Sequence, residues 1–174
     1  MPAERFTRRL NEQIGHELAA HNQYLSCAAH YDALTMPQMA AFFYAQAAEE
    51  RAHSLMMVQY LLDTDVPVVI PGVEAPVAAF DGVVAPMELA LAQERRVAQQ
   101  IGELLGIARE EGDFASEQFM QWFIKEQVEE VATMSDLLAV VARNVGNVES
   151  IEEYVAREQR EADRDAGAPR VAGG

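Results

Sequence analysis

Cysteine, basic side chains and long apolar runs are all scarce in this 174-residue sequence. The single cysteine, Cys27, cannot form an internal disulfide and suits a reducing cytoplasm. No uninterrupted apolar run approaches the ~20 residues that span a bilayer, and the polar start at residues 1–9 predicts no signal peptide. Only 13 Lys and Arg face 28 Asp and Glu, so the formal net charge is −15. This charge disfavours nucleic acids and anionic membranes as partners and favours cations.

Helical periodicity extends over most of the sequence. Apolar residues recur in alternating steps of three and four, which is typical of the buried faces of bundle helices. The pattern predicts an all-α domain over residues 1–161, with helices over about 5–34, 37–62, 86–111, 114–144 and 148–161. Thr35 and Asp113 are predicted N-caps of the second and fourth helices. The last residues, 162–174, lack periodicity, so we expect a flexible C-terminal tail.

The stretch between the second and third helices has a different composition. Prolines and glycines break residues 63–85 repeatedly, which predicts one long connection rather than a helix. At ~3.3 Å per extended residue, some 20 residues span ~65 Å, more than the ~40 Å length of these helices. The connection can therefore return the chain from one end of a bundle to the other. We expect a four-helix bundle with a long crossover and a short fifth helix.

Polar residues interrupt the apolar faces of all four long helices at regular intervals. Glu50 follows Glu17 by 33 residues, and Gln127 follows Glu94 by the same interval. His53 lies three residues after Glu50, and Glu130 lies three residues after Gln127, so each pair shares a helix face. The arrangement thus repeats at an offset of 77 residues. It predicts two helix hairpins that meet about a pseudo-twofold axis and bring these side chains into one buried layer.

Such a layer would hold four carboxylates with no inward-facing Lys or Arg to pair with them. A single buried glutamate is more often paired with a basic side chain than with a metal, and a cluster of protonated acids is a second alternative. Four unpaired carboxylates, however, would repel one another and raise their own pKa values. Two divalent cations balance this charge, and oxygen ligands with an imidazole suit iron or manganese. We interpret the layer as a carboxylate dimetal site within a four-helix bundle.

With these residues in view, the sequence resembles the ferritins, and among them the bacterial non-haem type. The resemblance covers about residues 5–161 and is carried by Asn11–Ile14 before Glu17, Ala48–His53, Glu94 and Gln121–Glu130. It implies a ferritin-like diiron domain that oxidises Fe(II) with dioxygen or hydrogen peroxide as acceptor. It also implies storage of a ferric mineral inside a hollow cage of twenty-four subunits.

The resemblance also implies roles for individual residues. Glu17, Glu50 and His53 would hold the first iron, and Glu50 would bridge to a second iron held with Glu94 and Glu130, with Gln127 close by. The neighbouring carboxylates of Glu49, Glu126 and Glu129 would form a third iron position. Tyr24 would lie against the centre as a candidate electron donor, the alternative being a core tyrosine with a hydrogen-bonded hydroxyl. His21 is expected to be a satisfied core histidine, and Trp122 to pack near the site.

Two departures separate the chain from bacterioferritins, which carry a second Glu-x-x-His pair and a haem-ligating methionine after the second-helix glutamate. Here the corresponding residues are Gln127, Glu130 and Arg51, so we expect no haem. Two other functions remain open. One is a diiron oxidase or peroxidase of the same fold that acts without mineral storage. The other is a non-catalytic cage subunit, which the complete ligand set disfavours.

Overall fold

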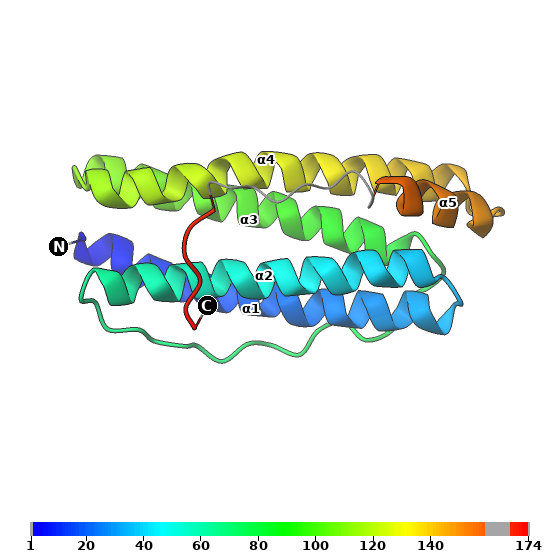
Figure 1. Cartoon of the computed structure of the whole chain (residues 1–174), viewed down its shortest axis with the longest axis horizontal. Helices are drawn as coiled ribbons and strands as arrows, with labels where there is room; N and C mark the ends of the chain where they lie inside the picture. Colours follow the sequence, from blue (N-terminus) through cyan, green and yellow to red (C-terminus); the bar gives the residue numbers. More distant parts are fainter. Residues whose placement is uncertain (1, 159–167, 174) are drawn as a thin grey trace.

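A computed structural model describes residues 2–158 and 168–173 and contains five helices and no strand among them. These helices are α1 (Glu4–Ala33), α2 (Pro37–Asp63), α3 (Ala85–Glu110), α4 (Phe114–Arg143) and α5 (Val148–Glu158). The four long helices lie side by side as a bundle, and α5 lies at one end of it (Figure 1). The predicted four-helix bundle with a short fifth helix is confirmed. Residues 159–161, expected to belong to the fifth helix, lie outside the described residues.

The long helices form two hairpins, α1 with α2 and α3 with α4, and the hairpins meet where α1 packs against α3. The connection between the hairpins runs along the length of the bundle in an extended form (Figure 1). Side chains of α1 hold it in place. Asn11 accepts from the backbone N of Val69 at 2.7 Å. Gln23 accepts from the backbone N of Val77 at 2.9 Å and donates to its carbonyl at 3.1 Å.

The connection also contacts α1 at Gly15, where a Cβ would lie 2.5 Å from Cγ of Pro71. We expect Gly15→Ala to displace the connection and to lower the free energy of unfolding by about 1–3 kcal/mol, as overpacking does. Gly102→Ala is the matched control, because a Cβ there meets nothing within 4 Å in α3. It should raise stability by about 0.5–1 kcal/mol, since alanine favours a helix over glycine. Chemical denaturation compares the two variants, and shifts of the same sign would contradict this packing.

The ends of the helices test two sequence predictions. Asp113 caps α4 as predicted, since its side chain accepts from the backbone N of Ser116 at 3.1 Å. The prediction that Thr35 caps α2 is wrong. Met36 occupies the N-cap position without a side-chain hydrogen bond, and Thr35 adopts a positive φ of 60° in the turn. The cap comes instead from α5, where Glu152 accepts from the backbone N–H groups of Gln38 and Met39 at 2.7 and 3.0 Å.

Residues 168–173 lie against α2. The expected flexible tail falls partly outside the described residues, and its described part, 168–173, contacts α2. The backbone N of Ala172 donates to the carbonyl of Leu55 at 3.2 Å. Arg170 forms an exposed ion pair with Asp63 at 2.5 Å. Within the described part of the chain, no helix combines the length and the hydropathy needed to cross a membrane.

Two apolar clusters fill the two ends of the bundle and leave a polar layer between them. One cluster lies toward α5 and includes Tyr31, Phe43, Met87, Met134 and Ile151. The other includes Phe6, Leu10, Met57, Ile101 and Met120. The apolar side chains of both clusters supply the burial that offsets the cost of a buried polar layer. That layer is composed of Glu17, Glu50, His53, Glu94, Gln127 and Glu130, all buried.

Candidate metal centre

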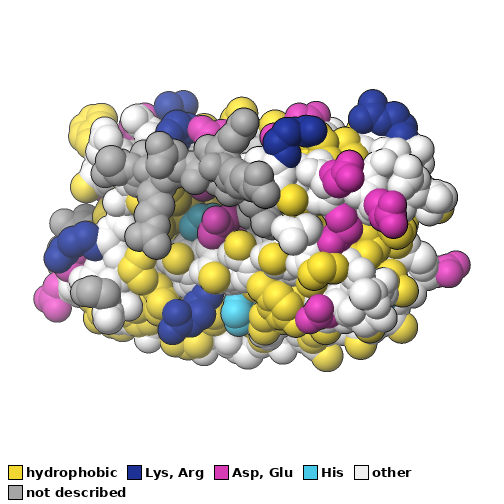
Figure 2. Space-filling model, turned by 45° about the vertical axis from the view of Figure 1, so that its right-hand side comes forward, with side chains coloured by type: hydrophobic (Ala, Val, Ile, Leu, Met, Phe, Trp, Pro, Cys, Tyr) yellow, Lys and Arg dark blue, Asp and Glu magenta, His cyan; other side chains and the backbone are white. Residues whose placement is uncertain are grey.

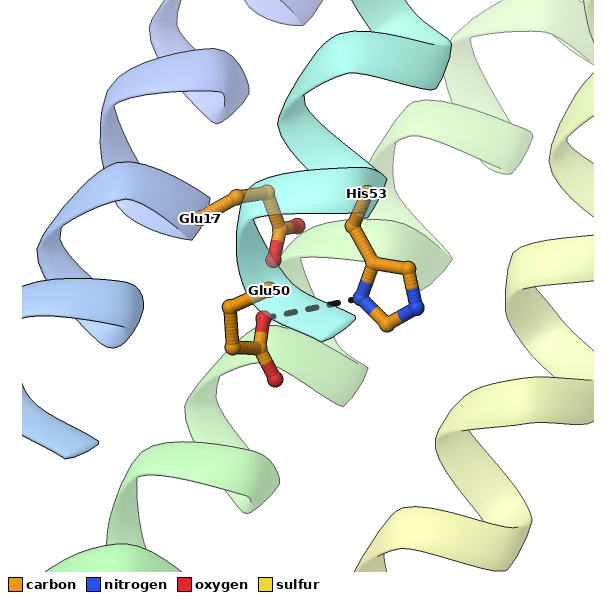
Figure 3. Close-up of side chains that lie close together, drawn as sticks. All are labelled: Glu17, Glu50 and His53. Atoms are coloured by element: carbon orange, nitrogen blue, oxygen red, sulfur yellow. Dashed lines mark ion pairs between the residues drawn. The ribbon is translucent and has the colours of Figure 1, made fainter. Parts of the chain in front are cut away.

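Three of the predicted ligands form one compact group. Glu17 projects from α1, and Glu50 and His53 project from successive turns of α2 toward it (Figure 3). Each offers one ligand atom, and these atoms all lie within 4.8 Å of one another. Nδ1 of His53 lies 3.5 Å from Oε2 of Glu50. The three residues are 1%, 2% and 5% exposed, so a cation between them would be almost wholly enclosed by protein.

The remaining predicted ligands come from the second hairpin. Glu94 on α3 is buried, and its two carboxylate oxygens accept from the hydroxyl of Tyr24 and from Nε2 of Gln127. Glu130 on α4 is also buried, and its Oε2 has no hydrogen-bond partner among the described residues. Glu94 and Glu130 lie outside the compact group around Glu50. Their negative charges nevertheless lie close enough to raise the pKa of Glu50.

Burial raises the pKa of Glu17, Glu50 and Glu130 well above the usual carboxyl range. Neighbouring negative charges raise these pKa values further. The charge of Glu50 raises the pKa of Glu17, and the charge of Glu94 raises the pKa values of Glu50 and Glu130. Burial also raises the pKa of Glu94, although the hydrogen bonds from Tyr24 and Gln127 oppose the increase. Within residues 2–158 and 168–173, no Lys or Arg forms an ion pair with any of the four. Carboxylates and an imidazole without a basic partner fit a divalent cation such as iron or manganese.

The residues predicted for a third iron position lie in a different place. A groove of about 640 Å³ lies between α2 and α4 and reaches α5, and its walls include Glu49, Glu126 and Glu129. Glu130 lines the same groove, so the buried layer and the groove share a carboxylate. Gln46 also lines it and donates to Oε2 of Glu49 at 2.5 Å. The structure therefore brings this acidic set together at the opening of the buried layer.

Three further predictions concern side chains around the centre. Tyr24 is fully buried, and its hydroxyl donates to Glu94. His21 is satisfied as predicted, with Nδ1 2.7 Å from the carbonyl of Ala47, but it is half-buried rather than part of the core. Trp122 packs near the site as predicted, its ring centroid lying 5.7 Å from that of His53.

Sequence reasoning missed two glutamines that contact the predicted ligands. Nε2 of Gln13 donates to Oε1 of Glu17 at 2.9 Å, and Gln46 contacts Glu49 as described above. The available signal was their register, since each lies three or four residues before a ligand on the same helix face.

The sequence and the fold of this chain are both similar to those of known proteins. The profile of the ferritin-like domain matches residues 7–144. Ferritin BfrB of Mycolicibacterium smegmatis is 49% identical over 170 residues, which cover 98% of this chain and 94% of that protein. A Mycobacterium tuberculosis protein, named ferritin BfrB or bacterioferritin BfrB, is 47% identical over 99% of this chain and 96% of its own length. The open-pore ferritin of Archaeoglobus fulgidus superposes with a TM-score of 0.84 at 28% identity, over 92% of this chain and 99% of that one.

Proposed function

Because the chain belongs to the ferritin family, we propose that it stores iron. In this proposal it binds Fe(II), oxidises it at a dinuclear ferroxidase centre within one subunit, and deposits ferric mineral inside a hollow cage of twenty-four subunits. The observation that carries the proposal is the enclosed group of Glu17, Glu50 and His53, which has no basic partner within the described residues. The electron acceptor is dioxygen or hydrogen peroxide.

The roles of the ligands follow from their placement and charge. Glu17, Glu50 and His53 hold the first ferrous ion, and Glu50 also contacts a second ion held by Glu94 and Glu130. Two divalent ions balance the charge of the four carboxylates. Each ion gives up one electron, so the pair reduces dioxygen to hydrogen peroxide, or peroxide to water, without releasing a one-electron product. Both reductions consume two protons, and the groove lined by Glu49, Glu126 and Glu129 gives solvent a route to supply them.

The second ion is held more loosely in this proposal. The carboxylate of Glu94 must exchange its hydrogen bonds from Tyr24 and Gln127 for the ion. The neutral amide of Gln127 binds an ion more weakly than a carboxylate or an imidazole would. Oxidised iron then moves past Glu130 into the groove. There Glu49, Glu126 and Glu129 form the third iron position. Tyr24 donates a hydrogen bond to the proposed ligand Glu94, which supports its role as the electron donor that the resemblance implies.

Self-association has support from the surface of the subunit. The crossover exposes Val69 and Ile70, which are 59% and 58% exposed, and Val73 and Val77 follow them. Figure 2 shows hydrophobic side chains over much of the lower half of one face, with most acidic and basic side chains around them. An apolar surface of this kind marks a protein contact. We assign it to contacts between subunits of the cage.

We further propose that the chain is of the non-haem type and acts in the cytoplasm. Arg51, an exposed residue directly after Glu50, replaces the methionine that bacterioferritins use for haem. Cys27 is buried and unpaired, as expected in a reducing compartment.

Addition of Fe²⁺ in air to the purified protein, followed by iron analysis and size measurement, tests the proposal. Storage predicts far more than two iron atoms retained per subunit, in a particle with about twenty-four times the subunit mass of 19.2 kDa. Oxidation of two irons per subunit in a small dimer would instead favour a diiron oxidase without mineral storage. Oxidation no faster than in buffer alone would favour the non-catalytic cage subunit.

A further inference from the structure

Gln13 lies one helical turn before Glu17, and every polar group of its side chain has a hydrogen-bond partner. Its side chain is fully buried. Nε2 donates to Oε1 of Glu17 at 2.9 Å and to Oε1 of Gln100 on α3 at 3.3 Å. Oε1 of Gln13 lies 3.2 Å from Nδ1 of His16. Both amide hydrogens and the carbonyl oxygen of Gln13 are therefore used.

The carboxylate of Glu17 decides which end of the Gln13 amide meets it, because an ionised carboxylate only accepts hydrogen bonds. With Nε2 of Gln13 on Glu17, the His16 tautomer that carries hydrogen on Nδ1 matches the Gln13 oxygen. Reversal of the amide would turn the Gln13 oxygen toward the carboxylate of Glu17 and toward the carbonyl oxygen of Gln100. Each of those contacts would place two acceptors together. The carboxylate of Glu17 thus keeps the donor end of Gln13, while Gln100 and His16 occupy the remaining amide hydrogen and the oxygen.

The hydrogen bond makes the two oxygens of Glu17 different from each other. Oε1 accepts from Gln13, while Oε2 is buried and has no hydrogen-bond partner among the residues described. The group formed by Glu17, Glu50 and His53 needs only one oxygen from each carboxylate.

We propose that Gln13 is a positioning residue that holds Glu17 as a one-oxygen ligand, with Oε2 directed at the cation. The inference rests on the proposed cation-binding role of Glu17. Binding through one oxygen leaves positions on the first ion for Glu50 and for the oxidant. Partners that orient ligands in this way typically contribute 10–100-fold to metal affinity.

The test uses Co²⁺, which binds oxygen and nitrogen ligands without being oxidised in the assay and has a visible spectrum that reports coordination. Calorimetric titration of the assembled protein should show that Gln13→Leu weakens the first Co²⁺ by about 10–100-fold. The visible spectrum of the bound ion should change as well, because Glu17 is free to bind through both oxygens. Gln13→Met, which keeps the length of the side chain, serves as a second variant and should give the same shift.

Gln23→Leu is the matched control. Gln23 is a buried glutamine on the same helix, but its amide bonds the crossover at Val77 and touches no proposed ligand. It should bind Co²⁺ with the affinity and the spectrum of the wild type. Gln100→Leu, which removes the acceptor of the other amide hydrogen of Gln13, should weaken binding in the same direction by less.

Two outcomes would overturn the inference, and they are distinguishable. Wild-type Co²⁺ affinity and spectrum in both Gln13 variants, with binding lost in Glu17→Ala, would refute the positioning role and leave the proposed centre intact. Unchanged Co²⁺ binding in Glu17→Ala would refute the centre itself. In that case Gln13 would have no ligand to position.

Discussion

Replacing Glu50 with alanine should slow Fe²⁺ oxidation by at least about 100-fold. Loss of a residue that only orients a metal ligand lowers metal affinity by up to about 100-fold. Loss of Glu50 should have a larger effect, because Glu50 is proposed to contact both ions. Its carboxylate lies within 4.8 Å of the ligand atoms of Glu17 and His53, and it is 2% exposed, so its loss would take a charged ligand out of an enclosed group. The initial rate of ferric absorbance after mixing with Fe²⁺ in air measures the effect.

The control for this experiment is Glu88→Ala, which removes an exposed carboxylate from the first turn of α3 and should oxidise iron at the wild-type rate. Glu50→Gln keeps the size of the side chain without its charge and should be nearly as slow as Glu50→Ala. Both Glu50 variants should remain folded, because they remove a buried carboxyl whose pKa is raised by burial and by its neighbours. Oxidation at the wild-type rate in a folded Glu50→Ala protein would contradict the assignment of the centre.

The metal-free protein should become more stable as the pH falls from about 8 toward about 5. Burial raises the pKa of Glu17, Glu50, Glu94 and Glu130 in the folded state above the value of 4.5 for a free carboxyl. Between that value and the raised pKa, the folded chain holds protons that the unfolded chain has released. The stability that these protons contribute is therefore fully present below the carboxyl pKa of the unfolded chain. It is lost as the pH rises through the raised pKa of the folded chain.

The expected slope is about 1.4 kcal/mol per pH unit for each carboxyl that stays protonated only in the folded state. For a chain of this size, each kcal/mol shifts the melting temperature by about 2–4 °C. Thermal unfolding of the metal-free protein between pH 5 and 8 measures the slope, and Glu50→Gln should reduce it. Saturating Co²⁺ should also flatten it, since the ion replaces the protons. A melting temperature that climbs steadily from pH 5 to 8 without metal would contradict a buried carboxylate layer.

The fold could be predicted from the sequence because its determinants are local and periodic. Apolar spacing gives the helices, and the prolines and glycines of residues 63–85 give the connection. The repeat at 77 residues then identified which polar positions face inward together. No single helix could have separated a metal ligand such as Glu50 from an unusual core residue. Two hairpins with matching intervals could make this distinction. Helices packed side by side in a bundle bring polar residues near their mid-points into one layer.

Other features depend on three-dimensional contacts that sequence spacing does not determine. Periodicity places Gln13 and Glu17 on one face, but only the packing of α1 against α3 shows that Gln100 accepts from the other amide hydrogen of Gln13. The cap of α2 by Glu152 depends on how α5 docks, so Thr35 was the nearer but wrong candidate. The groove beside Glu130 depends on the separation of α2 and α4, to which many side chains contribute.

Anomalous diffraction from crystals soaked with Fe²⁺ without oxygen tests the central claim most directly. The account predicts two iron peaks about 3.5–4 Å apart, as in other two-metal sites, inside the layer of Glu17, Glu50, His53, Glu94 and Glu130. The peak nearer α1 should contact one oxygen of Glu17 and the imidazole of His53. Iron bound only at the exposed carboxylates of the groove, with the buried layer empty at saturating Fe²⁺, would contradict it.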